Sequence, residues 1–158
     1  MPPKKVDVEA LVRKVYECEK CRDLGIKREP EKGVVPLFME GDLLRKEVWV
    51  VSLNPQLPQK DGLMKAEDAM DFRRYYHATI SFDRRHIQFF NNIEKQLLRH
   101  CGLKMGIDVA HTDLVKCGLK EGEKVPDEAV ERCSPYLIEQ MKMFRPNIVV
   151  ANGKRVCE

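Results

Sequence analysis

The fold is decided by the stretch Val48-Trp49-Val50-Val51-Ser52, an apolar run between the charged pair Lys46-Glu47 and the pair Asn54-Pro55. A continuous run of this length predicts a β-strand that is buried on both faces, as in parallel sheets. The strand must end before Pro55, because proline cannot donate a hydrogen bond to a neighbouring strand. The polar residues after it would lie at the carboxyl end of a central strand, where open α/β sheets bind ligands. An Asn-Pro pair is also a common turn, so its position alone assigns no role.

Two further apolar runs, at residues 109–115 and 147–151, predict strands that alternate with helices. Helical periodicity is clear over residues 7–17 and 90–101 and moderate over residues 66–77. Alternating strands and helices are typical of a parallel sheet covered on both faces. We therefore predict a single three-layer α/β/α domain over residues 1–158. Because a new helix would begin at Lys154, we expect this domain to lack its last element or two after Glu158.

Two details of the helices are predicted from single residues. The apolar stripe of the helix over residues 90–101 predicts that Cys101 is a small buried side chain and that Gly102 caps the helix. A short helix from Asp127 through Cys133 is expected to stop there, because Ser134-Pro135 suits the N-cap and first position of a new helix. Cys133 would then stand at a helix–helix joint, where free backbone N–H groups could point at sulfur ligands. The members of the first stripe are Phe90, Ile93, Leu97 and Cys101.

Composition excludes several classes of protein. Hydrophobic residues make up 43% of the 158 residues and charged residues 34%, with a net charge of +3, which describes an ordinary globular chain. The N-terminus lacks the apolar core of a signal peptide, and no apolar run approaches the roughly 20 residues that span a bilayer. We therefore expect a protein of the reducing cytoplasm with no membrane partner. There, a C-x2-C pair is more often metal-binding or catalytic than disulfide-bonded. We also expect the protein to be a monomer, although composition does not determine the oligomeric state.

Four cysteines form the strongest candidate site: Cys18 and Cys21 at C-x2-C spacing, and Cys117 and Cys133 fifteen residues apart. The close pair can bind one metal centre from a single turn, and folding must bring the distant pair to it. Four cysteine thiolates hold iron–sulfur clusters, and structural zinc uses the same ligands at the same short spacing. The spacing therefore leaves iron–sulfur and zinc open, together with the simpler interpretation of unrelated half-buried thiols. Cys157 at the chain end is expected to be a free thiol.

Taken together, these stretches resemble the uracil-DNA glycosylase superfamily over residues 11–156, and most closely its iron–sulfur prokaryotic branch. The likeness is poor between residues 57 and 85. The resemblance implies a [4Fe-4S] cluster held by the four cysteines. In this role the cluster cross-links loops and does not carry electrons. Beyond the cysteines, the matching stretches are Val34-Val35-Pro36, Thr112 to Cys117, Cys133 to Leu137 with Gln140, and Arg145 to Gly153.

The same resemblance implies candidate catalytic and base-binding residues. The loop from Ser52 to Gln56 departs from the iron–sulfur branch and is similar to the mismatch-specific and single-strand-selective branches, in which the matching Asn holds the attacking water. Asn54 is therefore the candidate catalytic residue, with Pro55 and Gln56 as substrate-binding neighbours. A stacking aromatic would be Phe89 or Phe90. The superfamily's late His-containing loop would lie beyond Glu158.

Asp113 stands where the superfamily commonly has an Asn that reads the uracil edge. An Asn can donate to uracil O4 and accept from N3–H, whereas an ionised Asp only accepts. We predict a DNA glycosylase of base-excision repair that hydrolyses the N-glycosidic bond of uracil or another deaminated base. Two alternatives stay open: a non-catalytic nucleic-acid-binding relative, and a zinc-stabilised α/β domain with another role.

Overall fold

Three parallel strands form one sheet in the order β2–β1–β3. The computed structural model describes residues 4–26, 48–54, 88–104, 108–119 and 123–157. The strands are β1 (Val48–Ser52), β2 (Val109–Asp113) and β3 (Ile148–Ala151). All five residues of β1 are buried, because a strand lies on each side of it and helices cover its faces. The predicted central strand, buried on both faces, is confirmed.

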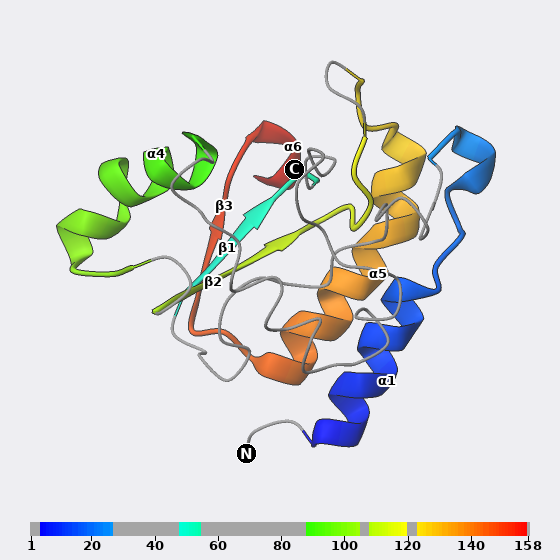
Figure 1. Cartoon of the computed structure of the whole chain (residues 1–158), viewed down its shortest axis with the longest axis horizontal. Helices are drawn as coiled ribbons and strands as arrows, with labels where there is room; N and C mark the ends of the chain where they lie inside the picture. Colours follow the sequence, from blue (N-terminus) through cyan, green and yellow to red (C-terminus); the bar gives the residue numbers. More distant parts are fainter. Residues whose placement is uncertain (1–3, 27–47, 55–87, 105–107, 120–122, 158) are drawn as a thin grey trace.

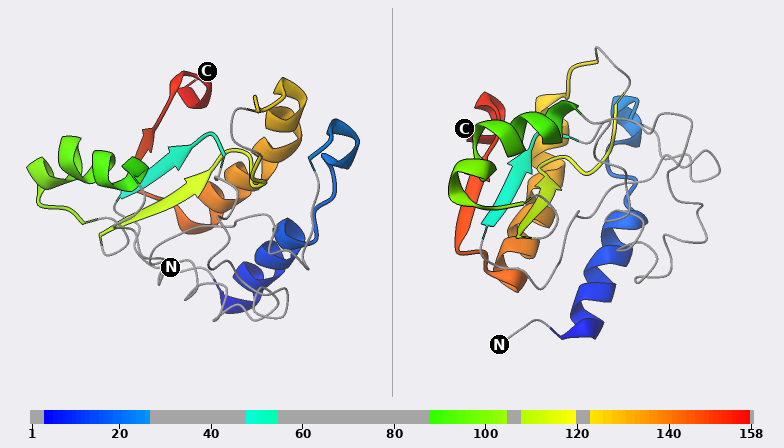
Figure 2. Two further views of the ribbon diagram at one scale, coloured as in Figure 1. Left: turned by 45° about the horizontal axis from the view of Figure 1, so that its top comes forward. Right: turned by 60° about the vertical axis from the view of Figure 1, so that its left-hand side comes forward.

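Helices lie on both faces of this sheet, as Figures 1 and 2 show. One face carries α4 and the 3-10 turn η4, and the other carries α5 with α1 packed beside it. The three-layer α/β/α fold with a central parallel sheet is therefore confirmed. No helix in the described ranges is both long enough and apolar enough to cross a membrane. The helix expected over residues 66–77 lies outside the described residues. The bounds are α1 (Lys5–Tyr16), η1 (Arg22–Leu24), α4 (Gln88–Gln96), η4 (Leu98–Cys101), α5 (Asp127–Phe144) and α6 (Lys154–Cys157).

The larger core lies between the sheet, α5 and α1. The Trp49 indole, which is fully buried, meets the ring of Phe144 with centroids 5.8 Å apart. The apolar stripe of α1 faces this core, as its 3.6-residue period predicts. On the opposite face, Leu98 packs with Val48, Val50 and Val109 in a smaller cluster. The buried residues of α1 in the larger core are Val8, Leu11, Val12, Val15 and Tyr16.

The helix predicted over residues 90–101 does not run to its end. The α-helix stops at Gln96, and Leu97 (φ −123°, ψ −60°) leads into the tighter turn η4. This change of pitch turns Leu98 into the core and leaves Leu97 39% exposed. The prediction that Cys101 is buried is wrong, because the same change leaves Cys101 exposed. Gly102 caps the turn in the left-handed conformation, as predicted, with φ 69°.

The predicted break before Pro135 is also wrong, because α5 is one 18-residue helix with Pro135 inside it. Proline removes the hydrogen bond that its own N–H would donate to the carbonyl four residues earlier, that of Glu131. The Ser134 hydroxyl donates to this Glu131 carbonyl instead, at 3.1 Å. The Ser134 side chain, which was predicted to cap a new helix, therefore pairs with the carbonyl that Pro135 leaves without a backbone donor. With this carbonyl paired, α5 continues through Pro135. Cys133 lies inside the helix and not at a joint.

Candidate functional site

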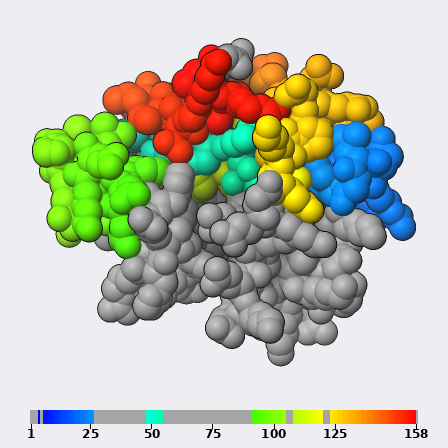
Figure 3. All heavy atoms as spheres, turned by 90° about the horizontal axis from the view of Figure 1, so that it is seen from above, coloured from blue at the N-terminus to red at the C-terminus, as the bar shows by residue number. Residues whose placement is uncertain are grey.

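The carboxyl ends of the three strands meet at one edge of the sheet, where α6 and the start of α5 also lie (Figure 1). Backbone hydrogen bonds continue past the strands: Leu114 donates to Ser52 and Val115 to Leu53, both at 2.8 Å. Asn54 lies two residues after the end of the central strand and is half-buried. In Figure 3 the residues of β1 (cyan) lie between α4 (green), α6 (red) and the segment entering α5 (yellow). Because these backbone hydrogen bonds fix the ends of β1 and β2, Asn54 has a defined position beside them.

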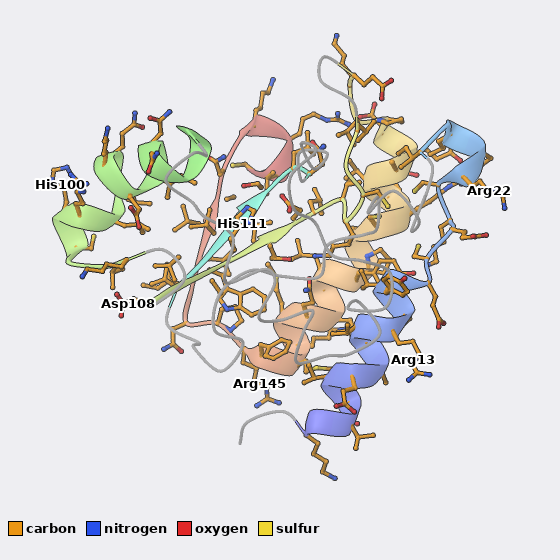
Figure 4. The ribbon with its side chains drawn as sticks, in the orientation of Figure 1. Arg13, Arg22, His100, Asp108, His111 and Arg145 are labelled. Atoms are coloured by element: carbon orange, nitrogen blue, oxygen red, sulfur yellow. The ribbon has the colours of Figure 1, made fainter. Side chains whose placement is uncertain are left out.

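A buried polar group lies on the α4 side of this edge. Ser52 and Asp113 are register partners, and His111 precedes Asp113 by two residues, so all three point to the same face. His111 Nε2 is 3.0 Å from Ser52 Oγ and 3.7 Å from Asp113 Oδ1. Figure 4 shows His111 over the sheet, away from peripheral charges such as Arg13 and Arg22. We did not predict this group, although the alternation along β2 places His111 and Asp113 on one face.

Lys116 forms a second buried network behind the same strand end. Its Nζ donates to Thr112 Oγ1 at 2.7 Å, to the Asp113 carbonyl at 2.6 Å and to Gln140 Oε1 at 2.5 Å. An ammonium group has three hydrogens, so three acceptors satisfy it fully. Burial lowers the pKa of Lys116 to about 7, against the opposing effects of the Asp113 carboxylate and the Cys133 thiolate. The network joins β2 to α5.

We expect Lys116→Met to lower the free energy of unfolding by about 1–3 kcal/mol, because the variant leaves buried acceptors without their donor. Met keeps the length of the side chain, so the change isolates the ammonium. Urea unfolding of both proteins at the same metal content measures it. The matched control is Lys142→Met at an exposed position of α5, which should stay within about 0.5 kcal/mol of wild type. Equal stabilities of Lys116→Met and wild type would contradict the expectation.

The fold brings the four predicted cysteines together. Cys21 and Cys133 are buried in the larger core, and Cys18 and Cys117 pack against it half-buried. The Cys21 thiol donates a hydrogen bond to the Cys133 sulfur, and the Lys116 backbone N–H donates to the same sulfur. None of the six cysteines is in a disulfide, and Cys101 and Cys157 are exposed elsewhere. The two pairs therefore converge, and their role as metal ligands stays a prediction.

The electrostatics of these thiols suit a cationic centre. The pKa of Cys21 is raised to about 12, chiefly by burial and then by the neighbouring thiolates Cys133 and Cys18. Burial likewise raises the pKa of Cys117 well above the range of a free thiol, and that of Cys133. Thiolates are the form that binds metals, so a metal centre must displace these protons and neutralise the charge. In the described part of the chain, no group of three or more His, Cys, Asp or Glu side chains is arranged so that it could hold a metal ion.

Two side chains of α5 hold the loop that carries Cys18 and Cys21. The Tyr136 hydroxyl donates to the Cys18 sulfur, and Lys20 Nζ lies 4.8 Å from the centroid of the Tyr136 ring. The Arg132 guanidinium donates to the Lys20 carbonyl and to both carboxylate oxygens of Asp23, at 2.5 and 2.9 Å for the latter. It also contacts Glu128, one turn earlier on α5. The hydrogen bond from Arg132 is the main reason that the pKa of Asp23 is lowered.

We expect Arg132→Gln to loosen this loop, because the variant loses the donors to the Lys20 carbonyl and Asp23. Amide hydrogen exchange over residues 18–25 should become about two- to fivefold faster, the scale of an exposed ion pair. Arg22→Gln is the matched control, since Arg22 is exposed and lies 3.6 Å from Glu19. Unchanged exchange in Arg132→Gln would show that the loop does not depend on this contact.

The remaining predicted site residues are only partly described. Phe89 and Phe90 belong to the first turn of α4, but their side chains lie outside what the structure describes. Pro55 and Gln56 lie wholly outside the described residues, as does Val34-Val35-Pro36. The residues that sequence reasoning missed are Lys116, Arg132 and His111. For His111 the sequence did carry a signal, because a titratable side chain within an otherwise apolar strand indicates a candidate functional residue.

The fold and site define an open parallel α/β protein with polar residues at the carboxyl ends of its strands and a cysteine cluster beside them. Residues 38–158 match the family described as the uracil DNA glycosylase superfamily. This match covers more than half of the chain, so the chain belongs to the uracil DNA glycosylase superfamily, as predicted. It is also 34% identical over 59 residues to the Type-4 uracil-DNA glycosylase of Archaeoglobus fulgidus. That stretch is 37% of this chain and 29% of the relative, so the chain spans less than a third of the curated relative's length.

Proposed function

We propose that this protein is a DNA glycosylase of base-excision repair that hydrolyses the N-glycosidic bond of uracil or another deaminated base. The observation that carries the proposal is the placement of Asn54 and Asp113 at the adjoining carboxyl ends of β1 and β2 in a member of this superfamily. The ends of parallel strands are where open α/β sheets bind ligands. The relative matched over 59 residues is itself named a uracil-DNA glycosylase.

In the proposed reaction, Asn54 positions the attacking water. Hydrolysis of an N-glycosidic bond passes through an oxocarbenium-like sugar, so the water must lie on the face of C1′ opposite the departing base. An amide can donate to and accept from this water but cannot take its proton. Positioning still contributes strongly where bond breaking leads bond making. The half-buried place of Asn54 after the central strand suits this role.

Asp113 reads the base in this proposal, after the nucleotide has been flipped out of the helix. Two contacts fix the backbone of Asp113: it is the register partner of Ser52 in the sheet, and its carbonyl accepts a hydrogen bond from Lys116 Nζ. Phe89 or Phe90 would stack on the flipped base. Pro55 and Gln56 would shape the loop that follows Asn54.

The four cysteines are proposed to hold a [4Fe-4S] cluster, as in the iron–sulfur branch of the superfamily. Cys18 and Cys21 come from the loop after α1, Cys117 from the segment after β2 and Cys133 from α5. When bound, the cluster supplies cross-links between these elements and takes no part in the hydrolysis. The reducing cytoplasm, our proposed compartment, keeps such thiols free for a metal. Broad visible absorbance of the purified protein distinguishes iron–sulfur from the alternative, zinc.

The test of the function is a cleavage assay on oligonucleotides that carry one uracil, hypoxanthine, xanthine or cytosine, single- or double-stranded. The metal-loaded protein is incubated with each, and alkali then cuts the strand at any abasic site. We expect cleavage of at least one deaminated base and none of cytosine. Binding of these oligonucleotides without cleavage of any would instead support the non-catalytic nucleic-acid-binding relative.

A further inference from the structure

Basic side chains gather on α4, on η4 and on the residues that follow η4. Four of them are exposed within ten residues of the chain, and no acidic residue stands between the first and the last. In the part of the chain that the structure describes, none of the four side chains forms an ion pair. We call these residues the basic patch: Lys95, Arg99, His100 and Lys104.

The basic patch lies to one side of the candidate site. Ile93 and Leu98 anchor α4 and η4 on the sheet, where they pack with Val48, Val50 and Val109. The polar side of these elements is left toward solvent, and Figure 4 shows His100 on their outer side. In Figure 3, α4 and η4 (green) lie at one end of the face on which the strands end. A DNA strand that runs from the ends of β1 and β2 toward α4 would therefore reach the patch.

The chemistry of the basic patch fits a phosphate backbone better than a protein surface. Lysine and arginine side chains bind nucleic acid largely by replacing the counterions of its phosphates. Protein interfaces instead centre on buried apolar and aromatic side chains. Among the side chains of α4 and η4 that the structure describes, Leu97 is the one large apolar group that is exposed, at 39%. Charge, and not apolar area, is thus what this surface offers a partner.

We propose that the basic patch binds the phosphate backbone of DNA beside the candidate site. This inference rests on the proposed glycosylase function for its choice of DNA as the partner, and it assigns the surface that holds the strand next to the reacting base. Contacts to phosphates fix the position of a protein on DNA and carry no sequence information. The patch therefore acts equally on damaged and undamaged DNA.

The test measures binding of the metal-loaded protein to an undamaged single-stranded oligonucleotide by fluorescence anisotropy over a range of salt concentrations. The variant carries Lys95→Gln, Arg99→Gln and Lys104→Gln together, which removes three charges from an exposed surface. Each phosphate contact on a single strand contributes roughly 0.7 to the slope of log Kd against log salt concentration, so the slope should fall by about 2. Affinity at low salt should fall with it.

The matched control carries Arg13→Gln, Lys142→Gln and Arg145→Gln, which removes the same charge from exposed positions on α1 and on and just after α5. Figure 4 shows Arg13 and Arg145 away from the carboxyl ends of the strands, so this variant should keep the wild-type slope. A second variant, Lys95→Arg with Lys104→Arg, keeps both charges of the patch and should also keep the slope.

An unchanged slope in the patch variant, an equal loss in the matched control, or no binding of DNA by wild type overturns this inference. The cleavage assay described above decides the glycosylase function separately. Binding that depends on the basic patch, without cleavage of any deaminated base, would overturn the proposed function and leave the DNA-binding surface in place.

Discussion

A Cys133→Ser variant is expected to purify without the iron, the sulfide and the visible absorbance of the proposed [4Fe-4S] cluster. Cys133 is 1% exposed and lies at the centre of the thiol group, with the Cys21 thiol and the Lys116 N–H both donating to its sulfur. A serine hydroxyl at this position would replace a thiolate with a much weaker ligand. Iron and acid-labile sulfide analysis, with absorbance spectra recorded under anaerobic conditions, measures the loss.

The same variant should lose much of its stability. Metal binding that occurs only in the folded state contributes directly to the free energy of unfolding. The four cysteines come from the loop after α1, the segment after β2 and the middle of α5, so loss of the proposed centre would release all three. We expect the free energy of unfolding to fall by on the order of 5 kcal/mol, a fraction of the binding energy of structural metal sites. Urea unfolding followed by tryptophan fluorescence reports this, because Trp49 lies in the same core.

Cys101→Ser and Cys157→Ser are the matched controls, because both thiols are exposed and lie outside the cluster. Each should keep the full metal content and the spectrum of wild type. Full iron content in Cys133→Ser would contradict the proposed ligand set. A colourless wild-type protein with one bound zinc would contradict the iron–sulfur assignment and leave a thiolate metal site in place.

The sheet could be predicted because each strand has a local signature. The run around Trp49 has no polar interruption, and the two flanking strands alternate with helical periods, so a parallel sheet with helices on both faces follows from pattern alone. The convergence of the four cysteines depended on the C-x2-C spacing and on the family resemblance. The sheet and the helices that cover its faces could therefore be predicted from the sequence.

The errors arose where a single contact decided the local structure. Pro135 normally ends a helix, but the Ser134 hydroxyl takes over the Glu131 carbonyl, and this pairing depends on a side-chain rotamer. Leu97 and Leu98 are both apolar, so only the pitch of η4 determines which one is buried. Lys116 would normally be assigned to the surface, because its acceptors come from β2 and from α5, 24 residues away. Contacts of this kind are settled by tertiary structure.

An Asn54→Ala variant is expected to lower kcat for base release by about a hundredfold, with little change in KM. Positioning of the attacking water acts on the chemical step, and a displacement of about 1 Å in a reacting group costs this much. The proposed base recognition by Asp113 is left intact, so ground-state binding should persist. Single-turnover kinetics on an oligonucleotide that carries the preferred deaminated base measures the chemical step separately from product release.

Asn152→Ala is the matched control for Asn54→Ala, because Asn152 is an asparagine that directly follows the neighbouring strand β3. Its backbone N–H donates to the Val51 carbonyl at 2.8 Å, a bond that alanine keeps, and its side chain is exposed. This variant should cleave at the wild-type rate. Asn54→Asp adds a second comparison, since a carboxylate can both position the water and accept its proton, and so should exceed Asn54→Ala in rate. Wild-type kcat in Asn54→Ala would place the water on another residue and remove Asn54 from the catalytic site.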